Sequence, residues 1–225
     1  MRNHLQAVLL LGGVAAAAQF PTAAARADEL LHLPAAGGVA LLASAAPGAP
    51  LVLLLPDAAG EDGRAAPYAD ALALRGFAVL TLGLDEEHAP DAATVRAALA
   101  WAVAHGHRPA GLVGWGAGAG PALSAGLPGV AMYPGCAALA GASGPALALR
   151  PHDAPRCAAS WVEQRFLLGA GHGWDVPGDF WPMGGVLLPD PEGGPRLRAA
   201  PDPGLTERVA TAVADWLVVQ LAELP

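Results

Sequence analysis

The sequence predicts an α/β fold in which a mostly parallel sheet is flanked by helices, and three observations lead to this prediction. Short apolar runs alternate with longer segments of helical periodicity, the pattern of parallel βαβ units. Residues 51–55 are continuously apolar, as expected for a strand buried on both faces. The glycine-rich segment 114–118 follows an apolar run and precedes a small-residue segment compatible with a helix. No internal repeat divides the chain, so its 225 residues are expected to form one domain with a sizeable core, at residues 28–225.

The elements can be placed in chain order from their apolar runs and from the residues that end them. Two short runs separated by glycines predict a hairpin at the sheet edge, at residues 30–34 and 39–43. Strands of the main sheet are expected at 51–55, 77–82, 112–113, 130–133 and 146–149, with the last strand at 166–168.

Helices are expected at 67–75, at 91–104, after the glycine-rich turn as far as 127–128, and at 204–221. The first should place Tyr68, Ala71, Leu72 and Leu74 on one face and end at Gly76. In the second, Asp91 is placed to accept a hydrogen bond from the first turn as an N-cap.

The N-terminus carries the pattern of an export signal. A positive start at Arg2 is followed by an apolar stretch at 5–20, and Ala25 and Ala27 fit a small-x-small cleavage site. We therefore predict a signal peptide at 1–27 and a periplasmic or secreted protein. The alternatives are a membrane anchor or a buried helix, but the stretch is short, glycine-interrupted and ended by Pro21, so no stable span is expected after cleavage.

Charge and motif content exclude several partners and cofactors. The formal net charge is −8, the chain has no lysine, and no basic cluster is present, so a nucleic-acid partner is not expected. The seven histidines form no metal-binding doublet, and no metal site is predicted. Residues 116–120 look like a phosphate loop, but no acidic residue follows at the spacing of a dinucleotide fingerprint, so no cofactor is predicted.

Residues 114–118 have the outline of a nucleophile elbow, the G-x-S-x-G turn between a strand and a helix. The central position normally carries the attacking oxygen or sulfur. Here it is Gly116, which has no side chain. The sequence thus predicts the architecture of a covalent catalyst without its nucleophile.

Two further residues follow later strands in the order acid, then histidine. Asp153 comes after the strand at 146–149, and His172 comes after the strand at 166–168. Read separately, Asp153 is a turn aspartate and His172 a loop histidine. Because the carboxyl ends of parallel strands meet at one edge of a sheet, we interpret the two together as the acid and base of a former triad beside Gly116.

With these pieces in place, the exported part of the chain resembles the dienelactone hydrolase family over nearly its whole length. The segments that carry the resemblance are 51–60, 68–77, 114–118, 132–136, Asp153 with Cys157, and 169–175. The resemblance implies an α/β-hydrolase fold and places Asp153 and His172 at the acid and base positions. It also implies an oxyanion hole from the N–H of Ala117 and that of Asp57 or Ala58, and puts Asp57 where the family has an acidic residue that influences the nucleophile. The family carries Cys or Ser at the position of Gly116.

Other residues leave alternatives open. In an exported protein Cys136 and Cys157 either form a disulfide or remain separate buried thiols, and a free Cys136 beside His172 is a second candidate nucleophile. Trp115 and Trp174, with Asp57, either line a ligand pocket or, for the tryptophans, pack in the core. Residues 177–201, rich in proline and glycine, are expected to pass over the site as a lid or as an ordered surface loop.

Three hypotheses for the function result. The first is an exported, catalytically lapsed hydrolase-like protein that binds a small ester, lactone or related ligand. The second is an active hydrolase of small esters or lactones that uses Cys136 or a water activated by His172. The third is a purely structural role.

Overall fold

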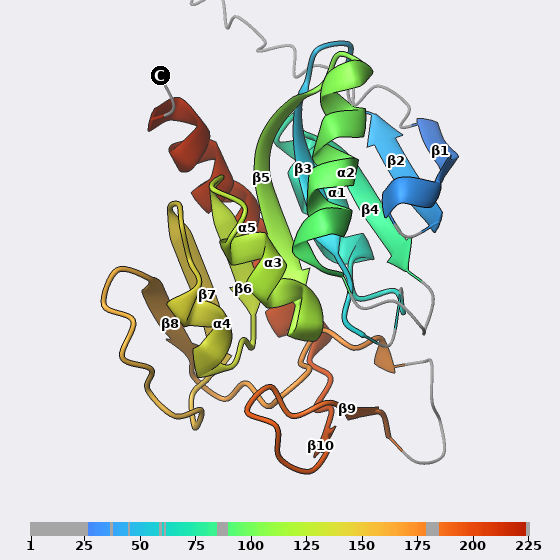
Figure 1. Ribbon diagram of the computed structural model, residues 1–225. Coiled ribbons are helices and arrows are strands. Elements are labelled where there is room, and N and C mark those ends of the chain that lie inside the picture. The colour runs from blue at the N-terminus through green and yellow to red at the C-terminus, as the bar shows by residue number, and fades with distance from the viewer. Residues whose placement is uncertain are drawn as a thin grey trace, which may run out of the picture.

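The computed structural model describes residues 27–36, 38–44, 46–58, 60, 62–84, 90–178 and 185–223. Within these ranges an eight-stranded sheet has the order β1-β2-β4-β3-β5-β6-β7-β8 (Figure 1). Its strands are β1 (Ala27–Leu33), β2 (Gly38–Ser44), β3 (Pro50–Leu55), β4 (Ala78–Leu84), β5 (Arg108–Trp115), β6 (Gly129–Met132), β7 (Ala146–Pro151) and β8 (Glu163–Leu167). β2 pairs antiparallel with β1 and with β4, and every other neighbouring pair is parallel. The predicted α/β fold is confirmed.

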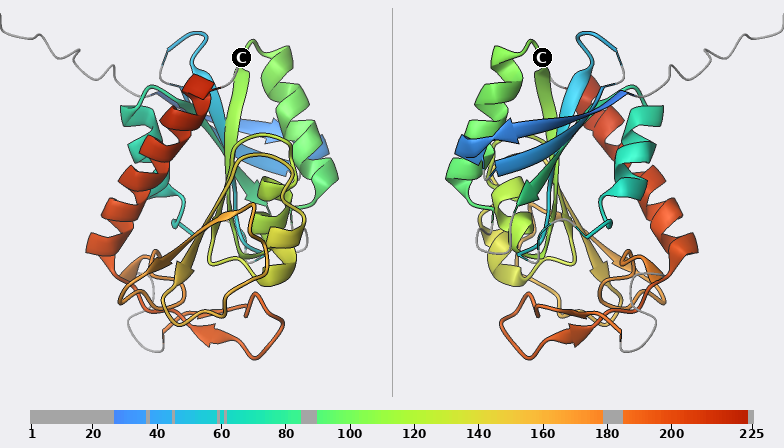
Figure 2. Two further views of the ribbon diagram at one scale, coloured as in Figure 1. Left: turned by 90° about the vertical axis from the view of Figure 1, so that its left-hand side faces the viewer. Right: turned by 90° about the vertical axis from the view of Figure 1, so that its right-hand side faces the viewer.

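Helices cover both faces of this sheet (Figure 2). They are α1 (Ala66–Leu74), α2 (Ala92–Ala104), α3 (Ala119–Leu123), α4 (Cys136–Ala140) and α5 (Pro203–Glu223), with short 3-10 turns η1 (Pro34–Ala36) and η2 (Gly116–Gly118). Buried residues of α1 and α5 belong to one core cluster, whereas those of α2, α3 and α4 belong to clusters on the other face. The result is a three-layer sandwich.

Strand β3 shows why its sequence is continuously apolar. Val52 and Leu54 belong to the core cluster of α1 and α5, while Leu51, Leu53 and Leu55 belong to that of α2. All five side chains are fully buried, because successive residues of a strand point to opposite faces. Each buried Leu contributes about 1.5–3 kcal/mol relative to an exposed one.

The predicted edge hairpin and the cap of α2 are confirmed. β1 and β2 pair at one end of the sheet order. Asp91 has extended backbone geometry and accepts a hydrogen bond from the Thr94 backbone N–H at 2.7 Å, which satisfies one of the free donors at the helix start.

Three expectations about elements are corrected. Leu74 is 74% exposed, because the helical repeat places it on the side of α1 away from the buried Tyr68 and Leu72. The helix after the elbow ends at Leu123 and not at 127–128, since the chain enters a turn in which Gly126 has φ +76°. The strand predicted at 166–168 spans Glu163–Leu167 and is followed by a two-residue pair, β9 (Leu187–Leu188) and β10 (Leu197–Arg198).

Some predictions fall on other parts of the chain. Residues 1–26 of the predicted signal peptide lie outside the described residues, as do residues 179–184 of the segment that was expected to pass over the site. Among the described residues, no helix has the length and apolar character needed to cross a membrane.

Candidate active site

The predicted strand–turn–helix elbow is present at the end of β5. The chain leaves Trp115, turns at Gly116 with φ +47°, and enters η2 and α3. The flanking glycines are required by close packing: a Cβ at Gly114 would collide with the Gly118 carbonyl, and one at Gly118 would lie 2.6 Å from the Leu55 carbonyl oxygen. These contacts explain why the elbow needs glycine on both sides of its central position.

The space beside Gly116 is occupied by the carboxylate of Asp57. Asp57 follows β3 after Pro56 and is only 2% exposed. A Cβ built on Gly116 would lie 2.5 Å from Cγ, Oδ1 and Oδ2 of Asp57. An acidic side chain from a neighbouring strand therefore stands where a side chain at the central position would begin.

The same carboxylate accepts hydrogen bonds from the two N–H groups predicted to form the oxyanion hole. The Ala58 N–H donates to Asp57 Oδ1 at 2.6 Å, and the Ala117 N–H donates to the same oxygen at 3.4 Å. The structure thus brings Asp57, Ala58, Gly116 and Ala117 together. In this arrangement the two donors serve a resident carboxylate.

Arg64 balances the charge of Asp57 from the loop before α1. Its Nη1 lies 3.6 Å from Asp57 Oδ2, its Nε donates to Asp62 Oδ1 at 2.8 Å, and Nη1 donates to the Tyr133 hydroxyl at 2.6 Å. Burial acts to lower the pKa of Arg64, but Tyr133, Asp62 and Asp175 outweigh it, so its pKa lies above the ordinary value. The guanidinium is therefore charged, and each of its named contacts is charge-assisted.

A second buried carboxylate, Asp175, completes a polar network beneath the elbow. Its Oδ2 accepts from Trp115 Nε1 at 2.7 Å and from the Tyr68 hydroxyl at 3.1 Å, and its Oδ1 accepts from the Tyr133 hydroxyl at 3.1 Å. Burial raises the pKa of Asp175, while the Trp115 hydrogen bond and the charge of Arg64 oppose the rise. The network joins α1, the end of β5, the segment after β6 and the loop after β8, and Arg64 links it to Asp57 after β3.

Tyr133, directly after β6, holds an unusual backbone conformation in this network. Its φ is +37°, the one positive value among the non-glycine residues that the structure describes. Its ring is fully buried and lies 4.7 Å from the ring of His172 and 5.1 Å from that of Trp174, between centroids. A left-handed backbone at a non-glycine residue costs on the order of 1–3 kcal/mol and persists where the surroundings impose it.

His172 lies in the loop after β8, as predicted, and is half-buried. Its Nε2 is buried and has no hydrogen-bond partner among the described residues. Burial lowers the pKa of His172, while the charge of Asp57 acts to raise it. The imidazole is thus biased toward its neutral form near the carboxylate that fills the elbow.

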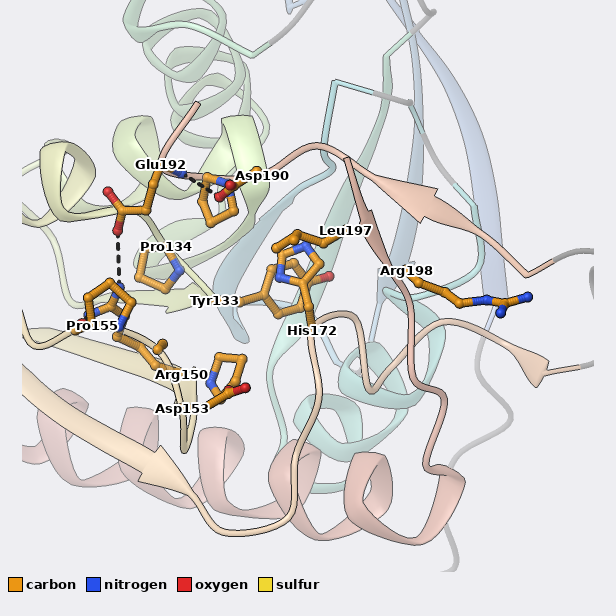
Figure 3. A pocket seen from close by; sticks show the side chains of 13 residues that line it. Tyr133, Pro134, Arg150, Asp153, Pro155, His172, Asp190, Glu192, Leu197 and Arg198 are labelled. Atoms are coloured by element: carbon orange, nitrogen blue, oxygen red, sulfur yellow. Dashed lines mark hydrogen bonds and ion pairs between the residues drawn. The ribbon is translucent and has the colours of Figure 1, made fainter. Parts of the chain in front are cut away.

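Asp153 and His172 line one pocket but are not joined in the described structure. Asp153 is exposed after β7, and no hydrogen bond links its carboxylate to the imidazole among the described residues. The pocket has a volume of about 370 Å³. Figure 3 shows its lining side chains, which come from the ends of β6 and β7, from the His172 loop and from residues 190–198.

The three residues predicted to bind ligand do not line this pocket. Trp115 and Trp174 are at most 1% exposed and belong to the core cluster of α1 and α5. Asp57 and Trp115 border a separate void of about 10 Å³. The pocket is lined instead by Tyr133, Arg150, His172 and Leu197, among others.

Cys136 and Cys157 form a disulfide with Cα atoms 5.2 Å apart. Of the two alternatives open from the sequence, the bridged one is observed. While the bond is intact, Cys136 offers no thiolate for nucleophilic attack. Glu192 lies beside the two sulfurs, but sulfurs already bonded to each other are not thiolate ligands for a metal.

The sequence did not indicate Arg64, Tyr68, Tyr133 or Asp175 as parts of the site. Asp175 lies three residues after His172 in the glycine-rich segment, and Tyr133 directly follows a buried strand, which were the available signals. Their roles depend on contacts between residues up to 107 positions apart.

The sheet order and the elbow together show that the protein has an α/β-hydrolase fold. No protein-family model matches the chain, and no curated protein matches it in sequence. Several solved structures match the chain in fold. A dienelactone hydrolase from Anabaena variabilis matches with a TM-score of 0.62 and 16% identity, covering 87% of this chain and 98% of that chain.

Two further structures agree on the architecture. The esterase domain of a Rhodothermus marinus protein has a TM-score of 0.61 and 13% identity over 87% of this chain and 99% of that chain. A dienelactone hydrolase-like promiscuous phosphotriesterase from metagenomic libraries has a TM-score of 0.56 and 15% identity over 87% and 98%. At such identities the likeness establishes a shared fold.

Proposed function

We propose that this chain is an exported, dienelactone-hydrolase-like protein that has lost nucleophilic catalysis and keeps a pocket for a small ester, lactone or related ligand. The observation that carries the proposal is the position of the Asp57 carboxylate. It lies against Gly116 and accepts hydrogen bonds from Ala58 and Ala117.

The chemistry of acyl transfer explains why this arrangement argues for lapse. The reaction needs an oxygen or sulfur nucleophile and N–H donors aimed at the developing oxyanion. Gly116 supplies no nucleophile, and the two donors already serve a buried anion. A substrate carbonyl at this position would have to displace Asp57 from its contacts with Ala58, Ala117 and Arg64.

The pocket beside His172 supports retained binding. Its volume of about 370 Å³ falls within the size range of small-molecule sites, roughly 300–1,000 Å³. It combines apolar side chains such as Leu197 with the polar groups of Asp153 and His172.

Export is supported by the signal pattern at 1–27 and by the disulfide, which is typical of oxidising compartments.

One observation favours a second candidate function, hydrolysis by a water that His172 activates. Its lowered pKa keeps the imidazole neutral near neutral pH, the form that accepts a proton. This candidate requires turnover that disappears in His172→Ala.

Binding without consumption tests the proposal. We expect phenyl acetate or γ-butyrolactone to raise the thermal unfolding midpoint of the mature chain. The added ligand should be hydrolysed no faster than it is in buffer alone. Leu197→Trp should fill the pocket and abolish the shift. Leu187→Trp is the matched control on the same strand pair, because Leu187 is 53% exposed and outside the pocket lining. Equal shifts in both variants, or none in the parent chain, would refute a ligand site here.

A further inference from the structure

A strap formed by residues 185–198 covers one side of the pocket and is fixed at its base to the His172 loop. The Ala199 N–H donates to the Val186 carbonyl at 2.8 Å, and the Ala200 N–H donates to the His172 carbonyl at 2.9 Å. Leu188 is buried and packs so closely that a Cβ at Gly173 would lie 2.5 Å from it. The base of the strap is thus part of the core.

The tip of the strap is a tight turn that presents Glu192. Asp190 holds this turn, because its Oδ1 accepts from the Glu192 N–H at 2.9 Å and its carbonyl accepts from the Gly193 N–H at 3.0 Å. Glu192 Oε1 then accepts from the Cys136 N–H at 3.0 Å. It also accepts from Arg150 Nη2 at 3.2 Å (Figure 3). The neighbouring Pro191 carbonyl packs directly on Gly135.

The disulfide holds both donors of Glu192 in one geometry. Cys136 supplies one donor from its own backbone. The other, Arg150, is placed by Cys157, whose Sγ lies 2.9 Å from Nη1, and by the Pro155 carbonyl. The Arg150 side chain is only 2% exposed, and the Glu192 carboxylate compensates its buried charge.

We propose that the disulfide gates the pocket: the strap tip is latched while Cys136 and Cys157 are bonded, and reduction releases it. This inference rests on the proposed function only in treating the pocket as a ligand site. A dithiol reductant would supply two electrons and two protons, the S–S bond would break to two thiols, and the reductant would become a disulfide. Two thiols cannot remain at bonding distance, so Cys136 and Cys157 separate. The Cys136 N–H and the Arg150 guanidinium, which both donate to Glu192, are then no longer held in a fixed position relative to each other.

Hydrogen–deuterium exchange of the folded chain tests the latch without any ligand or ester. In the strap peptides, amides of 190–194 should exchange about tenfold faster after reduction, the effect of losing hydrogen bonds to a charged group. Exchange is followed for seconds, so that it reports local opening of the folded chain. Peptides from α2 and β5, which exchange through global unfolding, should stay protected on this timescale and are the internal reference. The double variant Cys136→Ser, Cys157→Ser should reproduce the reduced pattern. If that variant fails to fold, reduction of the parent chain is sufficient as the test.

Two glycine variants separate lifting of the strap from redox chemistry. Gly135→Ala places a methyl group against Pro191 at an ordinary backbone conformation, φ −72°, and should speed exchange at 190–194 in the oxidised protein. Gly141→Ala is the matched control on α4, since its Cβ would meet only the Ala138 carbonyl at 3.7 Å.

The outcomes are distinct. Faster exchange confined to the strap after reduction supports the gate. Unchanged strap exchange after reduction overturns it, and so does equal exchange of the strap, α2 and β5 peptides on this timescale, which would mean that reduction opens the whole chain and not the strap. Because no ligand is involved, a failure here leaves the thermal-shift result for the proposed function unaffected.

Discussion

The carboxylate of Asp57 lies against the α-carbon of Gly116, in the space in which a hydrolase of this fold would need a nucleophile. A Cβ at Gly116 would lie 2.5 Å from three atoms of Asp57, closer than side chains approach in folded proteins. The carboxylate of Asp57 can therefore occupy this position because residue 116 has no side chain. Restoring a nucleophile requires changing both residues.

Gly116→Ser alone is expected to destabilise the protein and to leave it inactive. The new Cβ would overlap Asp57 and would stand on a backbone with φ +47°, so the free energy of unfolding should fall by about 1–3 kcal/mol. Urea unfolding and p-nitrophenyl acetate hydrolysis measure the two effects.

Gly116→Ser combined with Asp57→Ala should behave differently. It removes the overlap and frees the Ala58 and Ala117 N–H groups, while Arg64 keeps Asp62 as its partner. We expect hydrolysis about 10²-fold above the parent rate, the contribution of a positioned general base, and loss of this gain on adding His172→Ala. Equal activity in the single and double variants would show that Asp57 does not block the elbow.

Removing the Tyr133 hydroxyl tests the buried network. In Tyr133→Phe, Arg64 Nη1 loses its 2.6 Å acceptor and Asp175 loses one donor, so the free energy of unfolding should fall by about 1–3 kcal/mol. Trp161→Phe is a control at a side chain that is 59% exposed. Denaturant unfolding measures both, and equal small effects would contradict a stabilising network.

His172 is expected to make stability depend on pH. Its folded pKa lies below the ordinary 6.5 because of burial, so the unfolded chain binds more protons as pH falls. Stability should therefore be lost as pH falls through 6.5 toward the folded pKa. His172→Gln should flatten this part of the curve, whereas His152→Gln, at an exposed position, should not. Unfolding midpoints between pH 7 and 5 decide the matter, and identical slopes in both variants would refute it.

Much of the fold could be predicted from local pattern. The run at β3 records burial on both faces, Asp91 caps α2, and the glycines of the elbow mark a close packing that backbone sterics demand. These signals lie within a few residues of what they specify. The errors were of another kind. Leu74 was assigned to the buried face of α1 but lies on its exposed side, and β9 and β10, which were not predicted, are too short to show a period.

The content of the site was harder to predict because it depends on residues far apart in the chain. The empty position at Gly116 was visible in the sequence, and the family resemblance placed Asp57 near it. That the carboxylate of Asp57, 59 residues earlier, fills the space of the missing side chain was not visible. Asp153 and His172 reach one pocket, as their places after β7 and β8 suggested. Trp115 and Trp174 carry no sequence signal that separates a core aromatic from a pocket aromatic, and both are in the core.

Removing the disulfide should lower global stability as well as release the strap. The bond closes a loop between residues 21 positions apart, and chain entropy predicts a loss of about 3 kcal/mol without it. Guanidinium unfolding of the Cys136→Ser, Cys157→Ser variant measures this loss. An unchanged midpoint would mean that the bond contributes nothing to stability.

Turnover of an activated ester by the mature chain, run beside His172→Ala, tests the central claim most directly. The claim that Gly116 and Asp57 together leave no nucleophilic catalysis predicts that p-nitrophenyl acetate is hydrolysed at the same slow rate by both proteins, close to the rate in buffer. A parent rate well above buffer that disappears in His172→Ala would contradict it and would make the chain an active hydrolase that works through His172.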